Sequence, residues 1–113
     1  MYESPYLAHA TMEPLNATAD VRADGVTIWT GSQNQTAAQH LAADITGLPL
    51  EKIVVNTTFL GGGFGRRGWN DFVGDAVTVS KAAGVPVKLV WAREDDINSD
   101  RFRSRSVHGL AGT

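Results

Sequence analysis

The sequence contains no cysteine, no long apolar run and no marked excess of charge of either sign. Without cysteine, the chain cannot form disulfides, supply thiolate ligands to zinc or an iron–sulfur cluster, or use a cysteine nucleophile. No stretch approaches the roughly 20 apolar residues that a membrane-spanning helix needs, so we expect no membrane span. The formal net charge of −2 gives no reason to expect nucleic acid or an anionic membrane as a partner.

The length of the chain favours a single domain. A chain of 113 residues can bury one modest hydrophobic core, and this one contains no internal repeat and no low-complexity tract. We therefore expect residues 1–113 to form one domain. Met1-Tyr2-Glu3 does not open a signal peptide, and the sequence leaves the localisation undecided.

Glycine is concentrated in one place. Four of the five residues 61–65, which we call the glycine loop, are glycine, and the loop lies between a β-branched run and a helical pattern. Glycine costs backbone entropy and packs no side chain, so such a loop is typical of a backbone that needs positive φ or approaches another group closely. A strand that runs through glycines into a helix directs unpaired N–H groups at one point, which suits an anionic or hydrogen-bond-accepting ligand. The alternative is a tight connection that binds nothing.

Residues 1–30 predict an extended segment followed by a β-hairpin. His9 is a lone histidine in the extended segment and is interpreted as a structural hydrogen-bonding residue. Residues 17–22 and 26–30 alternate between apolar and polar side chains, and Asp24-Gly25 lies between them. Alternation on both sides of an Asp-Gly pair is a strong hairpin signal.

The next segment predicts a helix over residues 33–46. Ser32 is followed three residues later by Gln35, the pattern of a capping box, and apolar residues then recur at helical spacing. Gly47 provides a left-handed stop. We expect Ser32 to be the N-cap and Gln33 to lie in the first turn.

The second half of the chain predicts strand, helix and strand. Residues 53–59 are almost continuously apolar and β-branched, which suggests a strand buried on both faces. After the glycine loop, a helix capped by Asn70 or Asp71 ends at Gly84, and residues 85–91 form a short strand. This order implies an α+β fold: a two-layer sandwich in which two helices pack on a mixed β-sheet.

Charged residues follow the last predicted strand. Residues 93–96 lack the spaced carboxylates of a calcium loop and are expected to form a solvated turn. Arg101, Arg103 and Arg105 alternate along one face of an extended segment, where they are either solvated or contact a phosphate or a partner.

One reading of the glycine loop is a dinucleotide-binding module. Gly63, Gly65 and Gly68 satisfy the G-x-G-x-x-G spacing after a strand, and Glu94 or Asp95 lies near the place of a ribose-binding acid. Two arginines between the last two glycines are unusual where the helix should pack closely on its strand. This reading predicts binding of NAD or FAD.

A second reading comes from resemblance. The sequence Gly61-Gly62-Gly63-Phe64-Gly65 after a valine-rich strand resembles the signature of the molybdenum hydroxylases, the xanthine oxidase family. Residues 7–14 resemble the segment that enters the family's molybdopterin-binding region, and residues 32–34 resemble its glutamine-bearing turn. Residues 59–67 and 88–96 look most like the isoquinoline 1-oxidoreductase and membrane-bound aldehyde dehydrogenase branch. The resemblance covers nearly the whole chain.

The resemblance implies a set of cofactor contacts. In this family the glutamine of the turn hydrogen-bonds an oxo ligand on molybdenum, which implies that role for Gln33. The loop backbone lies against the metal end of the pterin, which implies Gly62, Gly63, Phe64 and Gly65 as cofactor contacts. Preorganised amide donors suit both groups. No residue of this chain is implied as a catalytic residue or as a direct metal ligand.

The resemblance also implies what this chain does not contain. The family's general base is a glutamate in a Gly-Glu context near the C-terminus of much longer subunits, and this chain has glutamate only in other contexts, at Glu3, Glu13, Glu51 and Glu94. We therefore expect a segment of a larger subunit that is inactive alone. Arg66-Arg67-Gly68 stands where xanthine-type enzymes carry an acid, so purine oxidation is not expected.

The intact enzyme implied by the resemblance hydroxylates aldehydes or N-heteroaromatic compounds with water-derived oxygen. It contains molybdopterin cytosine dinucleotide and passes electrons to an iron–sulfur small subunit, with a cytochrome c subunit as a further candidate partner; this branch is often periplasmic. Besides the dinucleotide module, a third reading stays open. In that reading the chain is a non-catalytic interaction module that binds neither cofactor and self-associates through apolar surface.

Overall fold

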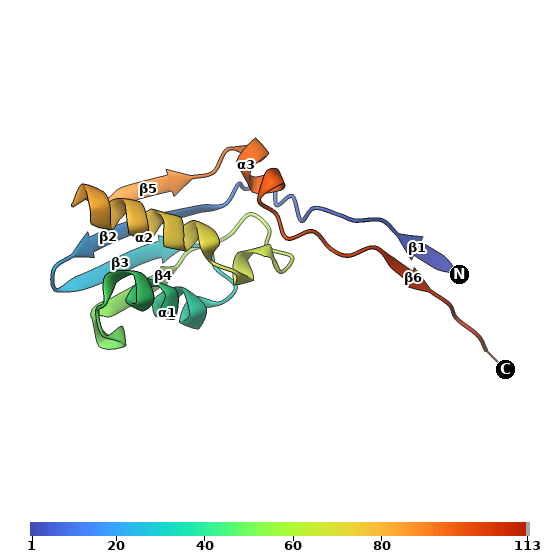
Figure 1. Ribbon diagram of the computed structural model, residues 1–113, viewed down its shortest axis with the longest axis horizontal. Coiled ribbons are helices and arrows are strands. Elements are labelled where there is room, and N and C mark those ends of the chain that lie inside the picture. Colours follow the sequence, from blue (N-terminus) through green and yellow to red (C-terminus); the bar gives the residue numbers. More distant parts are fainter. Residues whose placement is uncertain (113) are drawn as a thin grey trace.

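The computed structural model describes residues 1–112 and consists of a two-layer body and a projecting ribbon (Figure 1). The body contains a four-stranded sheet in the order β4-β3-β2-β5, formed by β2 (Asn16–Arg22), β3 (Gly25–Thr30), β4 (Ile53–Thr57) and β5 (Val87–Val90). Only the β3–β4 pair is parallel, so the sheet is mixed. Two helices, α1 (Gln35–Thr46) and α2 (Asp71–Ala83), cover one face. The predicted α+β two-layer sandwich is confirmed.

The core lies between the sheet and the two helices. The hairpin forms as predicted, with Arg22 paired to Gly25 across the turn, and its alternation directs one set of side chains toward the helices. The buried apolar side chains are Leu15, Ala17, Ala19, Val26, Ile28, Ala38, Ala42, Ile53, Phe72, Val73, Ala76 and Val77. Two alanines on α1 allow that helix to approach closely, and α2 supplies most of the larger side chains.

The prediction that residues 53–59 are buried on both faces is wrong. β4 is an edge strand, and the helices cover only one face of the sheet. Ile53 points into the core, whereas Val54 is 52% exposed on the opposite face. A run of β-branched residues reports a preference for extended backbone, and here it does not report burial on both sides.

The first helix begins later than its sequence suggests. It starts at Gln35 and its N-cap is Asn34, whose side chain accepts a hydrogen bond from Ala37 N. The Ser32 hydroxyl is buried instead and donates to the Asn70 side chain at 2.7 Å. The predicted N-cap at Ser32 is therefore wrong, and Gln33 precedes the helix rather than lying in its first turn.

The second helix and its flanking strand agree with the sequence. α2 begins after Asn70, which has a left-handed φ of 57°, and ends at Gly84. A short 3₁₀ turn, η2 (Arg66–Gly68), joins the glycine loop to it, and η1 (Leu50–Lys52) precedes β4. The solvated turn expected at residues 93–96 is instead the start of α3 (Arg93–Asn98), in which Asp96 is buried and bonded to Arg93 at 2.8 Å.

The two ends of the chain form the ribbon. β1 (Tyr2–Ser4) pairs antiparallel with β6 (Ser106–His108), and Leu7 bridges to Arg103 nearer the body. The ribbon extends away from the sandwich (Figure 1), so the radius of gyration is 17.0 Å, whereas about 13 Å is expected for a compact domain of this length. Within residues 1–112, no helix is long and apolar enough to cross a bilayer.

Candidate functional site

The glycine loop has a backbone that few other residues permit. Phe64 has a φ of 54° and Gly65 a φ of 103°, so two consecutive residues are left-handed. Left-handed backbone is rare for a residue such as phenylalanine, and it persists where the surroundings hold it in place. At Gly63, a Cβ atom would lie only 2.6 Å from the Gln33 side-chain carbon Cδ. The loop is thus shaped around the Gln33 side chain.

Gln33 faces the loop. Its Oε1 accepts a hydrogen bond from Gly65 N at 2.9 Å. Among residues 1–112, its Nε2 has no hydrogen-bond partner, and the residue as a whole is exposed. Because the carboxamide oxygen is occupied, the two N–H groups of Nε2 are the part left for a ligand. The structure therefore brings Gln33 together with the loop that the resemblance paired with it.

The loop presents donors rather than acceptors. Each of its five carbonyl oxygens accepts a hydrogen bond of 2.6–3.1 Å from within the chain; from Gly61 to Gly65 the donors are Glu13 N, Arg67 Nε, Arg66 N, Arg103 Nη2 and Gly68 N. The N–H groups of Gly61 and Gly65 are bonded to Glu13 and Gln33. Across the described residues 1–112, those of Gly62, Gly63 and Phe64 have no acceptor. Three consecutive N–H groups without acceptors form an attractive site for a ligand oxygen or nitrogen lone pair.

A buried arginine holds the loop from behind. Arg67 is fully buried, and its guanidinium donates to the carbonyl oxygens of Gly62 and Glu13 and to the Glu13 carboxylate, each at 2.8 Å. Burial lowers the pKa of Arg67, and the Glu13 charge opposes that shift. Desolvation works to raise the pKa of Glu13, but hydrogen bonds from Gly61 and Asn16 and the Arg67 charge leave it below its usual value. The pair is therefore held charged.

Its neighbour Arg66 is buried in a second group of charges. It makes a two-pronged contact with the Asp71 carboxylate at 2.9 Å for each bond, and its Nε lies 3.2 Å from Asp100. The guanidinium also lies over the Trp91 ring, 5.5 Å from its centre. We call Glu13, Arg66, Arg67, Asp71 and Asp100 the polar cluster. Burial also raises the pKa of the nearby Asp96, although Arg93 and Arg66 oppose the shift.

Sequence reasoning did not identify the polar cluster. The two arginines are an anomaly in the G-x-G-x-x-G pattern and stand where xanthine-type enzymes carry an acid. Two of their carboxylate partners, Glu13 and Asp100, lie far along the chain. The sequence did contain a signal. Two adjacent arginines between glycines, at the end of a loop that leads into a core helix, indicate charged side chains that are paired rather than solvated. Of the three alternating arginines, Arg103 donates to the Phe64 carbonyl, Arg101 lies over Trp69 and Arg105 pairs with Glu3.

The geometry differs from a dinucleotide fingerprint. The N–H groups of Gly65 and Gly68 are bonded within the chain, to Gln33 and to the Gly65 carbonyl. The segment Arg66–Gly68 is a 3₁₀ turn, and α2 begins only at Asp71. The helix N-terminus that would hold a pyrophosphate is therefore not at the last glycine of the pattern.

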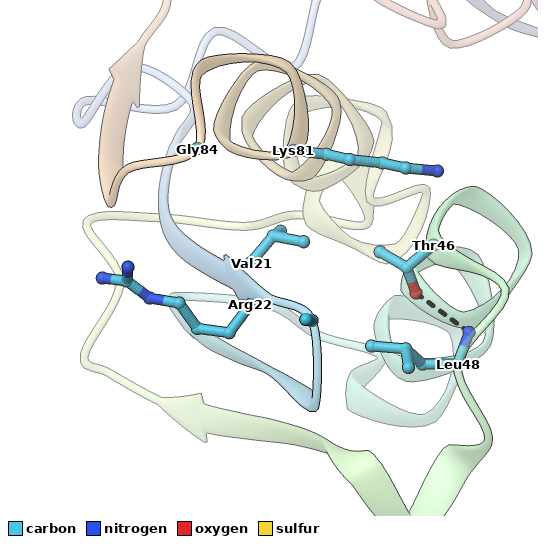
Figure 2. A pocket seen from close by; sticks show the side chains of 7 residues that line it. Val21, Arg22, Thr46, Leu48, Lys81 and Gly84 are labelled. Carbon is cyan, nitrogen blue, oxygen red and sulfur yellow. Dashed lines mark hydrogen bonds between the residues drawn. The ribbon is translucent and has the colours of Figure 1, made fainter.

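A cavity lies at the other end of α2. It is a pocket of about 420 Å³, open to solvent, between the C-terminal ends of the two helices and the hairpin, and it is lined by Val21, Arg22, Ala23, Thr46, Leu48, Lys81 and Gly84 (Figure 2). Lys81 Nζ donates a hydrogen bond to the Ile45 carbonyl oxygen at 2.6 Å. None of the five predicted site residues lines this cavity. Within residues 1–112, no group of three histidine, aspartate or glutamate side chains is placed to hold a metal ion.

Comparison with known proteins gives a consistent set of relatives. Residues 1–110 match the molybdopterin cofactor-binding domain family. Isoquinoline 1-oxidoreductase subunit beta of Brevundimonas diminuta is 38% identical over 102 residues, which are 89% of this chain and 13% of that protein. A membrane-bound aldehyde dehydrogenase [pyrroloquinoline-quinone] of Gluconacetobacter polyoxogenes is 41% identical over 108 residues, 94% of this chain and 14% of that one.

Solved structures agree on the fold. Aldehyde oxidoreductase from Desulfovibrio gigas superimposes with a TM-score of 0.79 at 22% identity, covering 92% of this chain and 12% of that chain. Reconstituted CO dehydrogenase from Oligotropha carboxidovorans gives a TM-score of 0.76 at 28% identity, covering 91% and 13%. The chain thus spans about one seventh of the length of the curated relatives it matches.

Proposed function

Because this chain belongs to the family of molybdopterin cofactor-binding domains, we propose that its glycine loop and Gln33 hold the metal end of a molybdopterin cofactor. The observation that carries the proposal is the row of three N–H groups without acceptors at Gly62, Gly63 and Phe64, with Gln33 Nε2 beside it. The cofactor supplies the two-electron chemistry of molybdenum when it is bound. The chain's own residues bind and orient it.

The donor set fits such a group. Oxo ligands and the carbonyl and ring nitrogens of a pterin accept hydrogen bonds, and this loop offers N–H donors whose positions are fixed from behind by Arg67 and Arg103. Gly63 lacks a side chain where the Gln33 carboxamide needs the space. The donors are therefore preorganised and bonded to no internal acceptor; Phe64 is exposed and Gly62 half-buried, and Gly63 between them is buried.

The finer details of the function are also proposals. We propose the cytosine dinucleotide form of the cofactor, on the resemblance of residues 59–67 and 88–96 to one branch of the family. Oxidation of N-heteroaromatic compounds or aldehydes by the whole enzyme is supported by relatives named isoquinoline 1-oxidoreductase, nicotinate dehydrogenase and aldehyde dehydrogenase.

Two of those names include the word subunit, which supports an enzyme of several chains. We propose an iron–sulfur small subunit as its partner, with a cytochrome c subunit as a second one. We also propose that residues 1–113 act as one domain of the larger subunit and are inactive alone.

Two glycine variants test the cofactor proposal. The probe is tetrahydrobiopterin, a reduced pterin, titrated into the ¹⁵N-labelled chain while amide chemical shifts are followed. We expect the amides of Gly62, Gly63 and Phe64 to move, and Gly63→Ala to abolish the response because its Cβ would displace Gln33. Gly68→Ala is the matched control, since a Cβ there meets nothing within 4 Å.

The same pair of variants also tests the alternative that the glycine loop binds a dinucleotide. If NAD moves the loop amides, the pterin does not, and Gly68→Ala removes the NAD response, the cofactor proposal is wrong. If NAD, tetrahydrobiopterin and molybdate all leave the three amides unmoved at millimolar concentration, the loop is only a tight connection.

Exposed apolar residues favour the interaction module as a second candidate. The face of the sheet opposite the helices carries Trp29, Val54 and Val90, all more than 40% exposed. This reading predicts concentration-dependent dimers in sedimentation velocity, lost in Trp29→Lys. A monomer at all concentrations would contradict it.

A further inference from the structure

His9 is a buried side chain with one nitrogen already assigned by its surroundings. The side chain is 6% exposed, and Nδ1 lies 3.0 Å from the Asp100 carboxylate. The backbone N–H groups of His9 and Arg101 donate to the same carboxylate, and Arg66 lies beside it. Because a carboxylate oxygen only accepts, Nδ1 is the donor of this contact, and the tautomer with its hydrogen on Nδ1 has the ring lone pair on Nε2.

The free nitrogen of His9 lies at the glycine loop. Nε2 is 3.9 Å from the place that a Cβ on Gly65 would occupy. Within residues 1–112, Nε2 has no hydrogen-bond partner. The buried side-chain atoms without a partner in that range are Asp20 Oδ1 and Arg66 Nε, so His9 Nε2 is accessible to solvent. A side chain more than nine-tenths buried thus directs an unpartnered acceptor at the loop that otherwise presents donors.

We propose that His9 is a second ligand-contacting side chain of this site, and that its Nε2 accepts a hydrogen bond from an N–H group of the bound heterocycle. The inference rests on the proposed function and deepens it. Asp100 is a positioning residue, because it fixes which ring nitrogen is protonated, and Arg66 holds Asp100 in place.

The Nε2 acceptor of His9 makes the site discriminate between ligands by their hydrogen-bonding groups. A simple oxyanion offers only acceptors, which the loop amides and Gln33 Nε2 satisfy without His9. A reduced pterin carries ring N–H and amino donors as well as acceptors, so it uses both kinds of group. His9 therefore distinguishes a heterocycle that has N–H donors from an oxyanion that has none. The segments that supply His9 and Asp100 run side by side toward the ribbon (Figure 1), and Leu7 and Arg103 bridge them.

The test follows the histidine ring nitrogens by ¹⁵N NMR in the intact chain. Tetrahydrobiopterin is expected to move the Nε2 signal of His9 but not those of His40 or His108, and molybdate is expected to move the loop amides without moving His9. His9→Asn retains an N–H for Asp100 and removes Nε2. It should bind the pterin about fivefold more weakly, the effect of one ordinary hydrogen bond. His40→Asn, on the exposed side of α1, is the matched control and should bind as the unaltered chain does.

The outcomes separate this inference from the proposed function. If the loop amides respond to the pterin while Nε2 does not move and His9→Asn binds unchanged, His9 is structural and the loop proposal stands. If molybdate moves Nε2 as much as the pterin does, the acceptor role is wrong. If molybdate moves the loop amides and the pterin moves nothing, the His9 role is wrong and the loop proposal stands, and if neither probe moves the loop amides, both proposals fail. Asp100→Asn adds a readout of positioning: the two ring tautomers should mix, and a ring that stays in one tautomer would show that Asp100 does not set it.

Discussion

The chain has two interiors that are held together in different ways. Between the sheet and the helices, alanine, valine, isoleucine and phenylalanine side chains pack without directional bonds. Beneath the glycine loop, the polar cluster buries two arginines among three carboxylates. Apolar packing is non-directional and loses stability in proportion to the atoms removed. A buried ion cluster depends on each of its partners. Here Glu13 and Arg67 also hydrogen-bond the loop backbone, at Gly61 N and Gly62 O.

The largest expected effect comes from breaking the polar cluster. Arg67→Met keeps much of the volume but leaves the Gly62 carbonyl without its donor, and it removes one of the donors of the Glu13 carbonyl and carboxylate. Because the Glu13 side chain is 39% exposed and water can reach its charge, we expect a loss of about 1–3 kcal/mol in the free energy of unfolding, the cost of the unpaired Gly62 carbonyl, measured by urea denaturation. Arg22→Met is the control, because the exposed Arg22–Asp20 pair should contribute less than about 1 kcal/mol. Equal losses in the two variants would show that the cluster is no stronger than a surface pair.

The apolar interior should respond less to a comparable single change. Ile28→Val removes one methylene from a fully buried side chain. We expect a loss of about 0.5–1.5 kcal/mol, with the loop amide signals unchanged in the NMR spectrum. If this variant shifts the signals of Gly62 to Phe64 as strongly as Arg67→Met does, the two interiors are not independent.

The smallest expected effect is on the dependence of stability on pH. The lowered pKa of Glu13 gives stability that is present above its ordinary value of 4.5 and is lost as the pH falls through the folded value. The raised pKa of Asp96 gives stability that is present below its ordinary value of 3.8 and is lost as the pH rises through the folded value. The two carboxylates therefore act in opposite directions.

Urea unfolding between about pH 7 and about pH 3 separates the two carboxylates. Glu13→Gln should flatten the loss of stability on acidification, and Asp96→Asn should make that loss steeper. Identical slopes in the two variants would contradict the assignment of opposite signs.

The same contrast explains what the sequence could predict. The hairpin, α2 and β5 follow from local periodicity and from Asp24-Gly25 and Gly84, so they were predicted correctly. The capping-box spacing of Ser32 and Gln35 predicts Ser32 as the N-cap. In the structure the Ser32 hydroxyl instead donates a hydrogen bond to Asn70, 38 residues away. Long-range polar partners of this kind leave no local pattern.

The site shows the same division. The glycine loop was found from its composition, and Gln33 from a family resemblance, because nothing in the spacing of residues 33 and 65 indicates that they meet. The Arg67–Glu13 pair, the Arg66–Asp100 contact and the His9–Asp100 contact each join segments that lie far apart in the sequence. These contacts could be read only from the folded chain.

The three N–H groups at Gly62, Gly63 and Phe64 are the central donors of the proposed cofactor site. Amide hydrogen exchange measures them directly, with Gly61 and Gly65 as neighbours whose N–H groups are already bonded. We predict fast exchange of the three amides in the free chain and marked slowing when tetrahydrobiopterin is added. Three amides that are already protected in the free chain, or that exchange equally fast with the pterin present, would contradict the account.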